Sequence, residues 1–293
     1  MRAESRLKAS APKMMLAALD LAFLPVLAWA ISIPIIKSKQ FKSLLFVGLL
    51  VVMTAGNALI HVEMLEWYEN TAHFGIRLIT AAVIVMILVI SGRIFPFFTE
   101  RRLSGVTVRR SPLLNSLSIS AAVAVFILDI FNFSGVLTAT LSMFAALINF
   151  KRVGGWYSNQ IWSVPLLWVL YLGYGWIIIG FMLMALSVFS PIFSALALHA
   201  FTLGGIGVLT LGMMARVSLG HTGRILEASN SMALGFVLIN LAAFLRVLLP
   251  AVFPSLYSFG VFSAALLWLL SFLIFLAVNL PILVAPRADG KVD

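Results

Sequence analysis

Long apolar runs separated by short polar segments dominate the pattern of this chain. Each run is continuous, and most are close to the roughly 20 residues that a helix needs to cross the hydrocarbon core of a bilayer. Membrane β-strands would instead alternate apolar and polar positions over about ten residues. The pattern therefore predicts an all-α, polytopic membrane protein with about nine transmembrane helices in one bundle, so that residues 1–293 form a single domain. The predicted helices cover residues 14–36, 44–62, 74–94, 113–131, 135–150, 165–188, 192–215, 231–249 and 257–280.

The composition agrees with a lipid environment. Of the 293 residues, 62% are hydrophobic and only 10% are charged, whereas soluble domains carry about 25% charged residues. The net charge of +10 comes from short basic clusters between apolar runs, which is typical of membrane topology signals rather than of a nucleic-acid surface. The chain has no cysteine, which excludes disulfides, thiolate metal sites and iron–sulfur clusters.

Basic residues indicate which loops face the cytoplasm. If nine helices alternate, most Lys and Arg residues fall in loops on one side, which is therefore predicted to be cytoplasmic. The opposite loops are short or acidic. Nine spans place the N-terminus outside although it is basic, so either residues 14–36 do not span or further helices precede them. The loops of the cytoplasmic side contain Lys37, Lys39, Lys42, Arg93, Arg101, Arg102, Arg109, Arg110, Lys151, Arg152, Arg216, Arg224, Arg287 and Lys291, and the N-terminus contains Arg2, Arg6, Lys8 and Lys13.

The predicted topology places the four histidines at different depths relative to the membrane. His61 and His73 are predicted near the outer ends of the second and third helices, and His199 lies roughly 10 Å into the seventh helix. These three histidines can meet in the outer leaflet, and imidazole suits copper, zinc and haem iron. His221 belongs to the cytoplasmic side, roughly 33 Å from His199 along a helix, so the two cannot share one metal ion.

Each histidine also has a simpler interpretation. His199 is either a ligand or proton-handling group or a buried side chain that bonds a neighbouring helix. His61 with Glu63 and Glu66 forms either a surface metal site or a set of solvated interfacial residues. Arg77, Asp129 and Arg246 also intrude on apolar segments, close to their outer ends, where snorkelling or an Asp129–Arg246 pair explains them.

The seventh helix combines His199 with small residues and ends in a polar tip, residues 218–224. Ala200, Gly204, Gly205, Gly207 and Gly212 let another backbone, or a planar cofactor, approach closely. In the tip, Gly220 and Gly223 permit backbone angles that other residues resist. The tip is either a structured helix–helix turn or a phosphate contact, although it lacks a P-loop pattern. No hydrolase constellation of Ser, His and Asp is present.

The segments HAFTLGGIG (199–207) and MARVSLGHTGR (214–224) resemble the signature of the NnrS family, which consists of bacterial integral membrane proteins. Further matches are NALIHVEML (57–65), GIRL (75–78), SGRIFPFFT (91–99), PLLWVLYLGYGWIIIGF (165–181), FLRVLLP (244–250) and LLWLLSFLIFLAVNLPIL (266–283). The resemblance covers nearly the whole chain. It departs at the front, because family members resemble a twelve-helix protein whose early helices carry a His-x-His-Glu-Met motif that this sequence lacks.

The resemblance implies a protein of the bacterial inner membrane that binds haem and copper and is linked to nitric oxide and nitrosative stress. By this resemblance the candidate cofactor-binding residues are His199, His61 and His73, and the candidate metal ligands are His199, His61 and Glu63. The carried-over signature loop comprises Arg216, Gly220, His221, Thr222, Gly223 and Arg224. The partners it implies are the lipid bilayer, nitric oxide and metal, with no nucleic acid.

Two other classes of function stay open from the residues. The first is a permease for a small solute or metal, with His199 as the proton or substrate site, although no internal repeat of discontinuous helices is evident. The second is a scaffold or sensor that has kept the fold and lost the cofactor. The residues themselves do not identify an enzymatic reaction.

Overall fold

The structure is a computed structural model that describes residues 2–290, with side chains described from Lys13 on. The basic side chains of Arg2, Arg6 and Lys8, and residue Lys291, which entered the topology prediction, lie outside the described residues.

The helical prediction is confirmed. Within residues 2–290 the chain contains helices and no strand, and nine of its helical segments are long and apolar enough to cross a membrane. The helices are α1 (Arg2–Lys37), α2 (Leu44–Met64), α3 (Ala72–Arg102), α4 (Pro112–Ile130), α5 (Val136–Gly154), α6 (Pro165–Leu186), α7 (Ile192–His199), α8 (Val208–His221), α9 (Asn230–Val252) and α10 (Tyr257–Val284). A π-helix, Ala200–Gly207, joins α7 to α8, so that both belong to one span, Ile192–His221.

Local signals explain where several helices begin. Pro165 stands at the first turn of α6, where its missing N–H costs nothing and its fixed φ suits a helix. Ser229 caps α9 because its Oγ accepts the backbone N–H of Met232 at 3.2 Å. Helix α3 continues through Pro96 to Arg102, eight residues past its predicted end. The apolar pattern predicts where a helix leaves the bilayer, but the helix can continue beyond that point into the aqueous phase.

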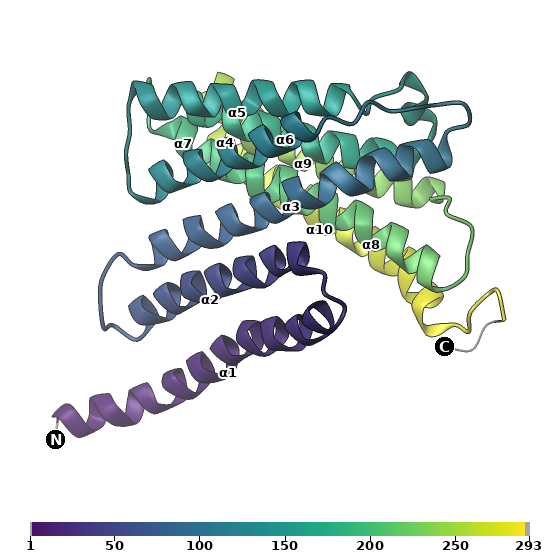
Figure 1. The fold of residues 1–293 in the computed structure, drawn as a ribbon. Helices are drawn as coiled ribbons and strands as arrows, with labels where there is room; N and C mark the ends of the chain where they lie inside the picture. The colour runs from purple at the N-terminus through teal and green to yellow at the C-terminus, as the bar shows by residue number, and fades with distance from the viewer. Residues whose placement is uncertain (1, 291–293) are drawn as a thin grey trace. The chain divides into compact units, whose positions relative to one another are not determined.

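The chain divides into two compact units, which are described separately. The first unit contains Met1–Ile87 and Phe126–Phe133, and in it α1 packs against α2 as an antiparallel hairpin (Figure 1). Gly56 of α2 meets Gly75 of α3 so closely that a Cβ on Gly75 would overlap the Gly56 carbonyl oxygen. This close approach is typical of membrane helices that pack through small residues.

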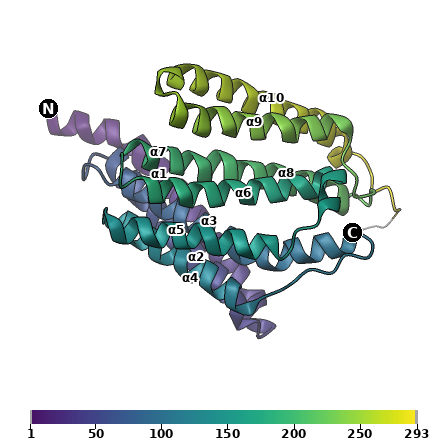
Figure 2. The same ribbon diagram turned by 90° about the horizontal axis from the view of Figure 1, so that it is seen from above.

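The second unit contains Leu88–Val125 and Ser134–Asp293, and α6 lies at its core. Tyr174, Ile177 and Phe181 of α6 have no solvent exposure. Helix α6 contacts α5 as well as the α7–α8 span, and α9 and α10 form an adjacent antiparallel pair (Figure 2). The division of the chain into units does not test the single-domain organisation, which stays a prediction.

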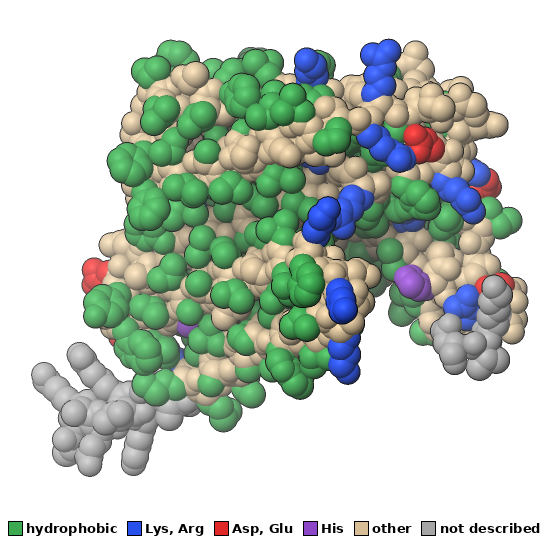
Figure 3. All heavy atoms as spheres, in the orientation of Figure 1, with side chains coloured by type: hydrophobic (Ala, Val, Ile, Leu, Met, Phe, Trp, Pro, Cys, Tyr) green, Lys and Arg blue, Asp and Glu red, His purple; other side chains and the backbone are tan. Residues whose placement is uncertain are grey.

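Hydrophobic side chains are spread over much of the face shown in Figure 3, whereas Lys and Arg side chains gather toward its right-hand part. Exposed large apolar residues occur along α1, α9 and α10, for example Phe23, Val237 and Phe262. Such a surface is favourable in contact with lipid tails, whereas apolar patches of this extent on soluble proteins mark binding sites or aggregation. The structure therefore supports contact with the bilayer.

Candidate functional site

A polar cluster joins α1 to α2 within the first unit. Oδ2 of Asp20 accepts hydrogen bonds from Nδ2 of Asn57 at 2.8 Å and from Nε2 of His61 at 2.8 Å. The imidazole of His61 is buried, with 8% of the residue exposed, whereas 55% of the Asp20 side chain is exposed. Three polar groups within apolar helices are costly unless they are hydrogen-bonded, and the two bonds to Asp20 offset part of that cost.

The second ring nitrogen of His61 is different. Nδ1 is buried and has no hydrogen-bond partner. Because a carboxylate oxygen can only accept, the proton of a neutral His61 lies on Nε2, and Nδ1 carries a free lone pair. Histidines that bind metals typically donate their other N–H to a carboxylate in this way. The cluster thus presents one imidazole in the tautomer that a metal ligand requires.

The other outer residues proposed as ligands are engaged separately. Oε2 of Glu63 accepts the backbone N–H of Ala72 at 2.7 Å and so caps the start of α3. Glu66 pairs with Lys13 at 3.3 Å on the exposed surface. His73 is exposed and its ring lies 4.5 Å from that of Phe74. These contacts place Glu63 and Glu66 in interactions that do not involve the His61 ring.

No group of three or more His, Asp or Glu side chains that can hold a metal ion occurs among the described residues. A closed centre with three protein ligands is therefore not formed by this part of the chain. The roles of His61, Glu63, His73 and His199 as ligands stay predictions, as does the meeting of His199 with the histidines of the first unit.

His199 lies in the second unit at the junction of α7 and the π-helix. Its Nε2 is 2.6 Å from Nη2 of Arg246 on α9. A guanidinium can only donate, so the Nε2 lone pair accepts this hydrogen bond. Nη2 of Arg246 also donates to the hydroxyl of Tyr257 at 3.3 Å, and Nη1 of Arg246 is buried without a hydrogen-bond partner. His199 therefore lies beside a fixed positive charge.

Asp129 and Arg246 each have a partner within their own unit. Nη1 of Arg77 donates to the carbonyl oxygen of Asp129 at 2.7 Å and lies 3.5 Å from its carboxylate. The same nitrogen also donates to Oδ1 of Asn132 at 2.7 Å. Within the first unit, the charges of Arg77 and Asp129 thus neutralise each other near the end of α4.

The glycines that follow His199 pack against α6. A Cβ on Gly204 would fall 2.5 Å from Cγ of Trp176, and one on Gly205 would fall 2.8 Å from Cγ1 of Ile177. Gly207 is different, since its nearest neighbour would be 3.5 Å away. Side chains of α6 thus occupy the faces of Gly204 and Gly205, so helix packing explains these two glycines without a planar cofactor.

The tip is a structured turn. Gly223 has φ of +68°, a conformation that favours glycine, whereas Gly220 is still part of α8. The carbonyl oxygen of Thr222 accepts the N–H of Ala288 at 3.0 Å, so the tip holds the segment after α10. Arg216 is buried, with its guanidinium 3.6 Å from the ring centroid of Phe98 on α3. His221 is exposed.

The sequence analysis missed a buried network around Arg152, which it counted only as a topology signal. Nη1 of Arg152 donates to the hydroxyls of Ser118 at 3.1 Å and Tyr174 at 3.0 Å. Both hydroxyls in turn donate to Oδ1 of Asn149. The signal available in the sequence was Asn149, a polar residue three positions before Arg152 and so on the same helix face.

One comparison with known proteins decides the family. The family model described as NnrS protein matches residues 5–287. The chain belongs to the NnrS family. No curated protein and no solved structure matches it.

Membership in the NnrS family confirms the resemblance found in the sequence. The match includes the His61 segment, the His199 helix and the tip. It also contains the Arg152 network, which sequence motifs did not single out.

Proposed function

We propose that this NnrS-family protein acts in the bacterial response to nitric oxide and nitrosative stress, in the inner membrane and in association with haem or copper. The family match over residues 5–287 supports the role. The arrangement of His61 is the single structural observation that supports a cofactor. Its Nε2 is held by Asp20, and its buried Nδ1 lacks a partner.

The described residues fit one kind of cofactor site and not another. A closed copper centre needs several ligands around one ion, and no such group is present among them. A haem can be held by one imidazole of the protein, and His61, which has the required tautomer, would be that ligand. A haem bound there would supply an iron that coordinates small diatomic gases.

The residues around His61 would set the properties of that ligand. Asp20 holds the proton at Nε2 and fixes the orientation of the ring, and Asn57 holds Asp20 through the same oxygen at 2.8 Å. Carboxylates in this position raise the basicity of the imidazole, and their removal typically costs about 10–100-fold in metal affinity. Asp20 and Asn57 are therefore positioning residues for His61.

His199 is the alternative ligand. Its Nε2 already accepts a hydrogen bond from Arg246 at 2.6 Å, and the guanidinium charge opposes a metal cation at the same place. For this reason His61 is the better-supported ligand, and His199 would require Arg246 to move.

Metal analysis and reduced-minus-oxidised absorption spectra of the detergent-purified full chain test this function. We expect bound haem in the wild type, loss of it in His61→Ala, and about 10–100-fold weaker binding in Asp20→Asn. His73→Ala is the control. The His73 ring is exposed, so we expect this substitution to leave the spectrum unchanged.

Three results of this experiment bear on the proposal in different ways. A folded wild-type protein without colour or metal would overturn the cofactor association. Loss of the cofactor in His199→Ala, with His61→Ala unaffected, would move the ligand to the α7–α8 span. Loss in His73→Ala would show that the single-ligand interpretation of His61 is wrong.

A permease for a small solute is the second candidate function. It is favoured by the π-helix at Ala200–Gly207, next to His199 and Arg246, because transporters place substrate sites at irregular helices within the membrane. Uptake assays in proteoliposomes separate the two candidates. Solute uptake that is lost in His199→Ala, in a protein without haem or copper, would favour the permease.

A further inference from the structure

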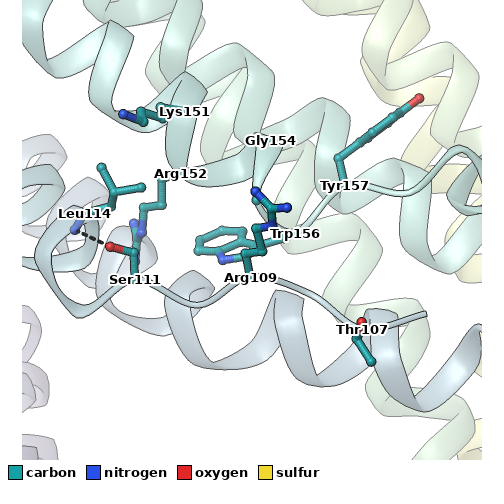
Figure 4. Close-up of a pocket in the computed structure, with 10 residues that line it drawn as sticks. Thr107, Arg109, Ser111, Leu114, Lys151, Arg152, Gly154, Trp156 and Tyr157 are labelled. Atoms are coloured by element: carbon teal, nitrogen blue, oxygen red, sulfur yellow. Dashed lines mark hydrogen bonds between the residues drawn. The ribbon is translucent and has the colours of Figure 1, made fainter. Parts of the chain in front are cut away.

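A cavity of about 500 Å³ lies in the second unit, where the loop after α3, the start of α4 and the end of α5 meet (Figure 4). In Figure 4, Arg152 extends from α5 toward Ser111, and Arg109 lies beside Trp156. The N–H of Arg109 donates to the carbonyl oxygen of Gly155 at 2.8 Å, which ties the loop to the end of α5. The cavity is thus built by paired segments rather than by a free loop.

The polar groups that line this cavity are basic residues and hydroxyls. Arg109, Lys151 and Arg152 supply three positive charges, and no Asp or Glu is among the lining residues. The hydroxyls come from Thr107, Ser111 and Tyr157. Three cations around one concave space repel one another, and an anion within the space relieves that repulsion.

Arg152 is the best-defined of the three cations, because it is fixed and buried. Only 2% of the residue is exposed, and Nε donates to Oδ1 of Asn115 at 2.8 Å. Nη2 donates to the carbonyl oxygen of Leu88 at 2.8 Å. Gly92 makes room for the guanidinium, since a Cβ there would overlap Nη2. The charge of Arg152 cannot be lost by deprotonation, because arginine stays protonated in proteins.

All acceptors of Arg152 that the structure describes are neutral. They are the Asn115 amide, the Leu88 carbonyl, and the hydroxyls of Ser118 and Tyr174. The Trp156 ring, whose centroid is 4.9 Å from Cζ, adds a cation–π contact. A buried charge without a carboxylate partner is costly, and a bound anion in the adjoining cavity would offset that cost.

Glu100, near the end of α3, does not supply the missing negative charge. Oε2 of Glu100 pairs with Nη2 of Arg110, and Oε1 accepts the N–H of Val108 at 3.3 Å. Glu100 thus neutralises Arg110, which does not line the cavity. Among the described residues, no acidic side chain pairs with the three cations that line the cavity, Arg109, Lys151 and Arg152.

The geometry points to a binding site for a phosphate group carried on a small organic body. Guanidinium and ammonium groups together with hydroxyls are the donors that bind phosphate oxygens. The volume lies within the range of about 300–1,000 Å³ typical of small-molecule sites and exceeds what one phosphate fills. Leu114 and Trp156 provide an apolar wall for the rest of the molecule.

Two sources carry this chemistry. The cavity lies where α5 and the α3–α4 loop end their apolar runs, on the side predicted to be cytoplasmic, and basic pockets at this level of membrane proteins bind anionic phospholipid headgroups. A soluble phosphate compound presents the same group from the aqueous side. The experiment therefore needs one arm for lipid and one for soluble phosphate.

The first arm measures retention of phosphatidylglycerol against phosphatidylcholine by the detergent-purified full chain, using native mass spectrometry. The second arm measures binding of radiolabelled inorganic phosphate by equilibrium dialysis. The test variant is Arg109→Gln with Lys151→Gln, which removes the two exposed cations and leaves the buried Arg152 network intact. The matched control is Arg93→Gln with Arg101→Gln, two exposed arginines of α3 that do not line the cavity.

We expect a selective ligand in at least one arm, with binding about tenfold or more weaker in the test variant and unchanged in the control. Selective retention of phosphatidylglycerol alone assigns the site to a lipid headgroup, and phosphate binding alone assigns it to a soluble compound. Absence of binding in both arms overturns the proposal. An equal loss in both double variants also overturns it, because net charge alone would then explain the binding.

Discussion

Nη2 of Arg246 lies 2.6 Å from Nε2 of His199, and this contact joins α9 to the only histidine of the α7–α8 span that lies at membrane depth. The guanidinium occupies the lone pair by which the imidazole would coordinate a metal. It also places a positive charge beside that position. We therefore expect Arg246→Met to increase copper binding by the purified chain.

The increase should come from His199 itself. Adding His199→Ala to Arg246→Met should abolish it, as measured by titration with copper and metal analysis after gel filtration. Tyr257→Phe is the control, because it removes one acceptor of Arg246, at 3.3 Å, and leaves the guanidinium in place. Unchanged copper binding in Arg246→Met would contradict the view that Arg246 blocks His199.

Gly204 and Gly207 form a matched pair for testing how α6 packs on the π-helix. A Cβ on Gly204 would fall 2.5 Å from Trp176, whereas one on Gly207 would meet nothing nearer than 3.5 Å. We expect Gly204→Ala to destabilise the protein by about 1–3 kcal/mol, as overpacking typically does. Gly207→Ala should be close to neutral. Unfolding in detergent, followed by circular dichroism, measures both, and equal effects would argue against this packing.

The hydroxyl of Tyr174 connects Arg152 with Asn149. It accepts from Nη1 of Arg152 at 3.0 Å and donates to Oδ1 of Asn149 at 2.5 Å. Tyr174→Phe leaves both buried partners with one bond fewer, for an expected loss of about 1–3 kcal/mol in the free energy of unfolding. Tyr157→Phe, at an exposed phenol bonded to Trp162, should change stability by about 0.5 kcal/mol or less. A Tyr174→Phe protein as stable as wild type would show that the network contributes little.

Gly223 connects the signature tip to the segment after α10. Alanine there must adopt φ near +68°, and its Cβ would fall 2.5 Å from Cγ of Asp289. We expect Gly223→Ala to weaken the docking of this segment by about 1–2 kcal/mol, the cost of a left-handed conformation. Trypsin should then cut at Arg287 about 5–30 times faster. Gly220→Ala, whose nearest neighbour would be 3.7 Å away, should leave the cleavage rate unchanged.

The apolar runs predicted the fold well because bilayer thickness imposes a length on every span. The run at 192–215 identified the span Ile192–His221, but nothing in it predicted the π-helix. Trp176 and Ile177 of α6 fill the faces of Gly204 and Gly205 within this segment. These contacts are tertiary, and hydrophobic periodicity does not contain them.

The candidate sites were predictable only in part. The sequence singled out His61 and His199 because histidine is rare and costly inside a membrane. It did not predict that Asp20, 41 positions earlier in the chain, holds His61, or that Arg246 holds His199. The sequence analysis treated Arg152 as a topology signal. Its hydrogen-bond acceptors come from α3, α4 and α6, which are distant in the sequence, so the sequence could not reveal the network. A basic residue near the end of an apolar run does not by itself indicate such partners, and Asn149 was the one sequence signal of a buried polar network here.

The π-helix at Ala200–Gly207 sets the angular phase between the two halves of the span that contains His199 and Arg216. Each hydrogen bond of a π-helix encloses one residue more than in an α-helix, so the stretch holds a surplus residue. Rewinding the same residues as an α-helix, at about 100° per residue, would therefore rotate α8 relative to α7. His199 could then keep its contact with Arg246, or Arg216 its contact with Phe98, but not both. The number of residues in this segment is therefore as important as their identity for keeping both contacts.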